Sequence, residues 1–164
     1  MLYHASFNVR RPAHAAQILS EMLGASAVRA PSRPFPPDSW FVLYGDEAGS
    51  FIELLPWGAV LTPETRFGIG RDELMRPYTG AHVLLSTPKT EEEIKALAAR
   101  QGWRVELVDA RLFKVLKVWI DDAILIELLT PSMVQAYVET FGAEGLASLD
   151  DKLRTLEQPP AAAR

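Results

Sequence analysis

An internal repeat constrains the fold of this chain more than any other feature. The run Ile-Glu-Leu-Leu at residues 52–55 recurs at residues 126–129, and a proline, Pro56 or Pro131, follows soon after each copy. A histidine lies near the start of an apolar segment 49 residues before the first glutamate and 45 residues before the second. Two copies of this size indicate a pair of related modules rather than a solenoid.

Both copies show the same order of hydrophobic patterns. The first reads as a strand over 3–9, a helix over 13–23 that Gly24 ends, a short apolar piece at 27–28, and strands over 40–44 and 51–55. The second reads as a strand over 81–86, a helix from the capping box at Thr90 to residue 101, and strands over 104–108, 114–120 and 124–129, with a turn at 121–122. We therefore predict an α+β fold of two βαβββ modules, residues 2–56 and 80–131.

The remaining segments join or follow the modules. Residues 57–79 are rich in Gly and Pro and are expected to be a linker. The segment 132–164 is predicted to be helical, with a frayed tail, because four leucines at 146, 149, 153 and 156 recur on one helical face. The length of 164 residues fits one domain.

Composition excludes several classes of protein. Hydrophobic residues make up 48% of the chain, which is too many for a disordered protein. A net charge of −4 gives no basic face for nucleic acid, and no apolar run reaches the roughly 18 residues of a membrane span. No cysteine is present, so any metal must be held by His, Asp, Glu or backbone oxygen. With no signal-like start, we expect a cytoplasmic protein without a membrane partner.

The repeated glutamates are the best candidates for chemistry. Glu53 and Glu127 lie in the middle of apolar strands, where a carboxylate is costly unless it is paired or coordinated. His4 and His82 open the first strand of each module, so the four side chains converge if the two sheets face each other, within one chain or between two. An ordinary structural role is the alternative, with Lys117 as an ion-pair partner of Glu127. Because His and Glu occupy equivalent points of both repeats, the metal-ligand interpretation is favoured.

With this repeat, residues 2–131 resemble the vicinal oxygen chelate superfamily, which includes glyoxalases, bleomycin-resistance proteins and dioxygenases. The resemblance implies a curved mixed β-sheet around a divalent metal, and a homodimer. The placement of His4, Glu53, His82 and Glu127 is similar to the metal set of glyoxalase I. The positions where that enzyme carries Arg and Asn for glutathione are Asn8 and Trp57 in this chain.

The resemblance implies a metal-dependent isomerase or lyase. Its metal would be Zn, Ni, Co, Mn or Fe, since nitrogen and oxygen ligands do not decide among them. Glu127 or Glu53 would remove a proton next to a carbonyl, and Asn8, Trp57 and Tyr78 are candidate substrate-binding residues. The substrate is expected to be a small molecule other than the glutathione adduct. A metal-free binding protein of the bleomycin-resistance type and an iron-dependent dioxygenase are the alternatives.

Overall fold

A computed structural model describes residues 3–31, 35–61, 69–71 and 80–157. Tyr78 lies outside these ranges. Among the residues described, no helix is long and apolar enough to cross a membrane.

The first module has the predicted βαβββ order. It comprises β1 (His4–Val9), α1 (Pro12–Leu23), β2 (Ser26–Arg29), β3 (Trp40–Leu43) and β4 (Phe51–Pro56). The strands form a sheet in the order β1-β4-β3-β2, in which β1 is parallel to β4 and the other pairs are antiparallel. The chain therefore returns to the centre of the sheet with β4, which carries Glu53.

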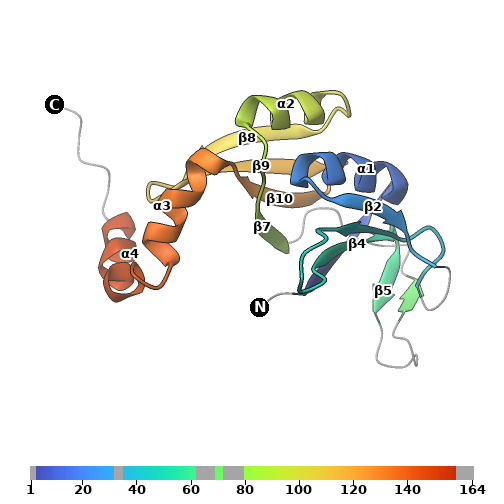
Figure 1. The fold of residues 1–164 in the computed structure, drawn as a ribbon, viewed down its shortest axis with the longest axis horizontal. Helices are drawn as coiled ribbons and strands as arrows, with labels where there is room; N and C mark the ends of the chain where they lie inside the picture. Colours follow the sequence, from blue (N-terminus) through green and yellow to red (C-terminus); the bar gives the residue numbers. More distant parts are fainter. Residues whose placement is uncertain (1–2, 32–34, 62–68, 72–79, 158–164) are drawn as a thin grey trace.

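The second module repeats this topology. It comprises β7 (His82–Ser86), α2 (Glu91–Ala99), β8 (Arg104–Asp109), β9 (Lys114–Ile120) and β10 (Ile124–Leu129), with the sheet order β7-β10-β9-β8. In this sheet, β7 is parallel to β10. The prediction of two βαβββ modules is confirmed, and Figure 1 shows α1 and α2 side by side above the two sheets.

Alternation along β4 and β10 explains which face each strand turns toward its helix. Ile52 and Leu54 are almost fully buried, as are Ile126 and Leu128 in the second module. Because side chains alternate across a strand, the glutamates between them point to the opposite face. The core thus lies between each sheet and its helix.

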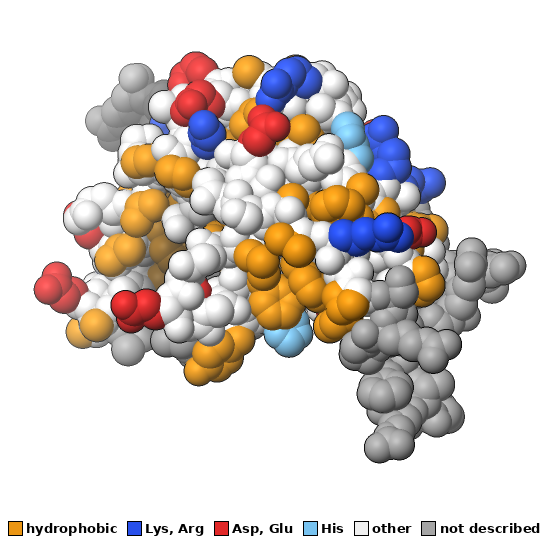
Figure 2. Space-filling model, turned by 45° about the vertical axis from the view of Figure 1, so that its right-hand side comes forward, with side chains coloured by type: hydrophobic (Ala, Val, Ile, Leu, Met, Phe, Trp, Pro, Cys, Tyr) orange, Lys and Arg blue, Asp and Glu red, His pale blue; other side chains and the backbone are white. Residues whose placement is uncertain are grey.

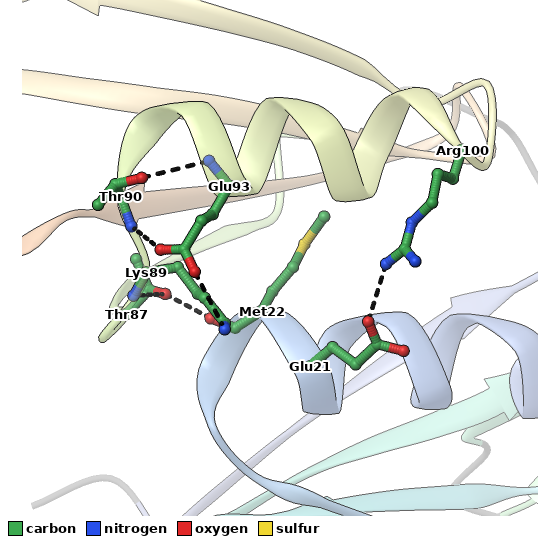
Figure 3. Close-up of polar contacts among 7 residues, drawn as sticks. All are labelled: Glu21, Met22, Thr87, Lys89, Thr90, Glu93 and Arg100. Atoms are coloured by element: carbon green, nitrogen blue, oxygen red, sulfur yellow. Dashed lines mark hydrogen bonds and ion pairs between the residues drawn. The ribbon is translucent and has the colours of Figure 1, made fainter.

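The two modules contact each other through α1 and α2, as Figure 3 shows. The Thr87 hydroxyl donates a hydrogen bond to the carbonyl of Met22 at the end of α1. Arg100, which caps the C-terminus of α2, forms an ion pair of 2.9 Å with Glu21. These contacts join residues far apart in sequence and set how the modules sit together.

The segment between the modules is not wholly irregular. Within residues 57–79, β5 (Ala59–Leu61) pairs antiparallel with β6 (Ile69–Arg71). The turn-forming composition of this stretch hid both short strands, since three-residue strands show too little alternation to detect.

The described part of the C-terminal segment is helical, as predicted, and the predicted frayed tail over residues 158–164 lies outside the described residues. The described part contains α3 (Pro131–Phe141), the 3₁₀ turn η1 (Leu146–Ser148) and α4 (Leu149–Glu157). Of the four leucines expected on one apolar face, Leu149 is half-buried and Leu153 is 41% exposed, and the side chains of Leu146 and Leu156 lie outside the description. The contact with the second module is made by α3, which packs on β9 and β10.

Candidate functional site

The first half of the candidate site lies on β1 and β4. In the parallel register, Ser6 is opposite Glu53, and its hydroxyl donates a hydrogen bond of 2.6 Å to Glu53 Oε2. His4 is opposite Phe51, and the two rings stack at 4.8 Å with their planes 13° apart. The stack holds an exposed imidazole at the start of β1, on the same face as Glu53.

The second half lies on β7, β9 and β10. Glu127 Oε2 is 3.8 Å from His82 Nε2, and Glu127 Oε1 is 3.8 Å from Lys117 Nζ. The other ring nitrogen of His82, Nδ1, lies 3.0 Å from the carbonyl oxygen of Gly80. The Glu127 side chain is only 15% exposed, so the two cationic or polar neighbours compensate for its burial.

Lys117 lies where the alternative interpretation, an ordinary structural role for Glu127, predicted it: beside Glu127 as an ion-pair partner. It faces Glu127 directly across the antiparallel pair β9–β10. At 3.8 Å the contact is an ion pair rather than a tight hydrogen bond. Glu127 thus has both neighbours that the sequence suggested, a histidine and a lysine.

Within one chain, the four predicted ligands form two separate halves. The residues described contain no group of three or more His, Asp or Glu side chains that could hold a metal. The pair His82–Glu127 supplies two possible ligands, which do not by themselves fit a divalent metal that takes four or more. Each His–Glu pair by itself is therefore too small a ligand set for a metal site, which would need further ligands.

Two of the predicted substrate-binding residues have partners inside the chain. The Asn8 side-chain amide donates to the carbonyls of Pro56, at 3.2 Å, and Ala59, at 2.6 Å, so it holds the chain where β4 leads into β5. The Arg10 guanidinium lies over the Trp57 ring, 5.1 Å from its centroid. Tyr78 lies outside the residues described.

A cavity of about 280 Å³ lies between the two modules, beside the first half-site. Residues from three segments line it: Tyr3, His4 and Ala5; Tyr44, Asp46, Ser50, Phe51 and Ile52; and Val83, Leu84, Leu85 and Ser86. Sequence reasoning did not find this cavity. No local pattern signals a cavity whose walls come from β1, the β3–β4 connection with the start of β4, and β7.

Two titratable groups of this cavity have shifted pKa values. Burial, with a smaller effect from the nearby Asp46 carboxylate, raises the pKa of Tyr44 to about 12. Hydrogen bonds from Ser50, the backbone N–H first, lower the pKa of Asp46. The cavity therefore combines a neutral phenol in its wall with an ionised carboxylate.

No protein-family description matches the sequence, and neither does any curated protein. Solved structures do match. The fosfomycin resistance protein FosX from Mesorhizobium loti is 19% identical, with a TM-score of 0.51 over 84% of this chain and 97% of that one. FosX from Listeria monocytogenes, in complex with Mn(II) and sulfate ion, is 14% identical, with a TM-score of 0.55 over 86% of this chain and 97% of that one. At such identities the likeness shows a shared fold.

Proposed function

Since the chain has the vicinal oxygen chelate fold, we propose that it is a metal-dependent isomerase or lyase of the glyoxalase type that acts on a small carbonyl compound. The observation that carries the proposal is the pair of equivalent half-sites, each with one His and one Glu on the sheet face away from the helix. A fold neighbour crystallised with Mn(II) supports the choice of a divalent metal. When bound, such an ion would act as a Lewis acid toward the substrate oxygen.

The structure distinguishes the two glutamates. Glu127 is flanked by His82 and Lys117, which suits a residue that holds a fixed charge. Glu53 accepts a hydrogen bond from the neutral Ser6 hydroxyl, and no ion pair to Glu53 is found among the residues described. We assign the general base to Glu53, because among the residues described its carboxylate is held by the Ser6 hydroxyl alone, whereas the Glu127 carboxylate is engaged by both Lys117 and His82.

The proposed step is a proton transfer next to a carbonyl. The Glu53 carboxylate takes a proton from the carbon beside the carbonyl, and the electron pair of the broken C–H bond moves onto the carbonyl oxygen. In an α-hydroxy carbonyl compound, Glu53, now protonated, returns the proton to the former carbonyl carbon. The hydroxyl proton of the neighbouring carbon moves to the former carbonyl oxygen, and the new carbonyl forms on that neighbouring carbon. The Ser6 hydroxyl keeps Glu53 Oε2 in place throughout.

The test is exchange of substrate protons for deuterium. With the metal-loaded protein in D₂O, we expect the protons next to the carbonyl of hydroxyacetone to exchange faster than in buffer, as followed by NMR. Glu53→Gln should remove at least about 100-fold of this acceleration, the usual scale of a general base. Glu92→Gln, at an exposed position on α2 away from both half-sites, is the control and should exchange like the unchanged protein. Equal rates for the unchanged protein and E53Q would overturn the assignment.

A metal-free binding protein is the second candidate. It is favoured by the separation of the half-sites within one chain, since the described residues hold no three ligands together. Elemental analysis of protein purified without added metal separates the two. Close to one metal ion per chain supports the enzyme, whereas a metal content near zero, with no uptake on titration, supports the binding protein.

A further inference from the structure

The cavity between the modules has the walls of a small-molecule site. Its lining is mostly apolar, from Ala5 and Ile52 on one side and residues 83–85 of β7 on the other. Ligand sites commonly have this composition, with a few polar groups that orient the ligand. At about 280 Å³ the cavity is at the small end of ligand sites, which are typically about 300–1,000 Å³.

The polar groups of the cavity restrict the charge of its occupant. The Asp46 carboxylate accepts a hydrogen bond of 2.8 Å from the Ser50 backbone N–H, and this hydrogen bonding helps to keep it ionised. Tyr44 is neutral at physiological pH, as an ordinary tyrosine is, and burial raises its pKa further, to about 12. No Lys or Arg lies among the residues described that line the cavity. An anionic occupant would therefore meet a like charge with no cation to balance it.

His4 links this cavity to the proposed site. Its imidazole lines the cavity and stacks on Phe51, which lines it too. The residue is exposed, so its ring is open to solvent. A neutral imidazole has one N–H donor, which can bind a carbonyl oxygen. Figure 2 shows hydrophobic side chains gathered on one face of the molecule.

From these observations, we infer that the cavity takes the apolar substituent, aryl or branched alkyl, of an uncharged carbonyl compound whose oxygen, in the metal-free protein, accepts a hydrogen bond from His4. The carbonyl class rests on the proposed function. The apolar substituent and the absence of negative charge follow from the cavity itself. The cavity thus selects which carbonyl compounds can be held beside the first half-site.

Acetophenone is a suitable probe, and metal-free full-length protein is sufficient. We expect saturable chemical-shift changes at the methyl groups of Val83, Leu84 and Leu85, with a Kd of about 1 mM or tighter, a reasonable affinity for so small a ligand. Nuclear Overhauser contacts from the phenyl ring to these methyls should locate the ligand without any substitution. Benzoate, of similar size but anionic, should bind several-fold more weakly.

Two variants test the location and the hydrogen bond. Ser86→Phe adds a ring at an exposed lining position and should weaken acetophenone binding at least about tenfold, whereas Ser26→Phe, exposed on β2 outside the lining, should not. His4→Phe keeps a ring on Phe51 but removes the donor. It should weaken acetophenone several-fold and leave ethylbenzene unchanged. A thermal melt of each variant checks that it is folded.

The outcomes separate this inference from the proposed function. No saturable shift at residues 83–85, equal binding by S86F and the unchanged protein, or equal affinity for benzoate would overturn the inference. If H4F and the unchanged protein bind acetophenone with equal affinity, the hydrogen bond from His4 is rejected and only the cavity assignment stands. Binding of acetophenone without deuterium exchange on the metal-loaded protein would leave the cavity assignment standing and reject the catalytic proposal. Deuterium exchange without acetophenone binding in the cavity would support the catalytic proposal and reject the cavity assignment.

Discussion

At the scale of single residues, Asp121 shows how one turn position can connect two modules. The sequence predicts a turn at residues 121–122, and both residues adopt a left-handed backbone there, with φ of 50° and 52°. Asp121 also accepts hydrogen bonds from Arg11, at 3.1 Å, and from the Trp103 indole N–H, at 3.2 Å. Its side chain is 6% exposed, so these bonds are made in a water-poor environment. The link to Arg11 joins the second module to the start of α1.

We predict that Asp121→Ala lowers the free energy of unfolding by about 1–3 kcal/mol, because it leaves the buried indole N–H without an acceptor. Asp121→Asn should cost less, since Asn tolerates the left-handed backbone and its side-chain oxygen can accept from Trp103. Urea denaturation measures both. Equal losses for the two variants would show that the negative charge, rather than the hydrogen bond to Trp103, is the important feature.

The contacts of Asn8 and Trp57 lead to a second prediction at this scale, on the turnover of a glutathione adduct. Asn8 is already bound to two backbone carbonyls, and Trp57 lies beneath Arg10. Neither can anchor the carboxylates of glutathione as a bidentate guanidinium would. We expect negligible turnover of the methylglyoxal–glutathione adduct after loading with Ni²⁺, Zn²⁺, Co²⁺ or Mn²⁺. A steady-state assay beside a known glyoxalase I tests this, and a kcat/KM near the 10⁶–10⁸ M⁻¹s⁻¹ range of efficient enzymes would contradict it.

At the scale of elements, the start of α2 was predicted in detail. The structure confirms the capping box: Glu93 N–H donates to the Thr90 hydroxyl, and Thr90 N–H donates to the Glu93 carboxylate, as drawn in Figure 3. Lys89 Nζ adds an ion pair of 3.3 Å to Glu93. The hydrogen bond from the Thr90 backbone, followed by that from Lys89, lowers the pKa of Glu93. A four-residue pattern suffices here because every partner is local.

We predict that Thr90→Ala lowers the free energy of unfolding by about 1 kcal/mol, the typical cost of losing an N-cap. The contribution of Glu93 depends on pH. Because its folded-state pKa is lowered, the contribution is present above the usual Glu pKa of about 4.3 and is lost as pH falls through the folded value. Denaturant titrations at pH 7 and pH 3 should therefore show a smaller difference between Glu93→Gln and the unchanged protein at pH 3. A difference that grows at pH 3 would contradict the assignment.

Among the C-terminal helices, α3 makes the packing contacts with the second module. Met133 is 7% exposed against the second module, and the rings of Phe113, Tyr137 and Phe141 contact one another at 5.0–5.8 Å. We expect deletion of residues 132–164 to lower the melting temperature or to dissociate an oligomer, because it exposes this apolar surface. A chain ending at Glu157 is the control. Calorimetry and size-exclusion chromatography measure the effect, and unchanged stability and size would reject a structural role for the segment.

At the scale of the whole molecule, the separation of the half-sites leads to a prediction about assembly. A second copy could bring its His82 and Glu127 to His4 and Glu53 of the first. In that case, two variants that each lack one half-site should together form an intact site. We expect neither His4→Ala/Glu53→Gln nor His82→Ala/Glu127→Gln to bind metal alone. After co-refolding, the mixture should recover about a quarter of the metal capacity, because half of the random dimers carry one intact site of two.

Calorimetric titration with Mn²⁺ measures the capacity of each sample. Recovery in the mixture supports a site shared between copies. If the unchanged protein binds metal fully and the mixture of the two double variants shows no recovery, the site lies within one chain. Sedimentation of the unchanged protein provides the control, since a monomer would exclude the shared site at once.

Local patterns predicted much of this architecture. Period-two alternation along each strand accounts for the burial of the Ile and Leu on either side of Glu53 and Glu127, and for the opposite face that the glutamates occupy. Glycine and the capping box correctly marked the ends of helices at Gly24 and Thr90. The pairing of β5 with β6 was missed because each strand is only three residues long. The role of Asn8 in holding the chain after β4 was missed because its partners lie 48 and 51 residues away.

The sequence by itself determined what each module is and which face of its strands carries the charged residues. Those properties depend on the spacing of neighbouring residues along one strand or helix. Only the tertiary structure decided how the modules meet, through Thr87 on Met22, Arg100 on Glu21 and Arg11 on Asp121. These contacts join segments 65 to 110 residues apart, and no local pattern specifies them. The same long-range packing formed the cavity beside His4 and kept the two His–Glu half-sites apart within the chain.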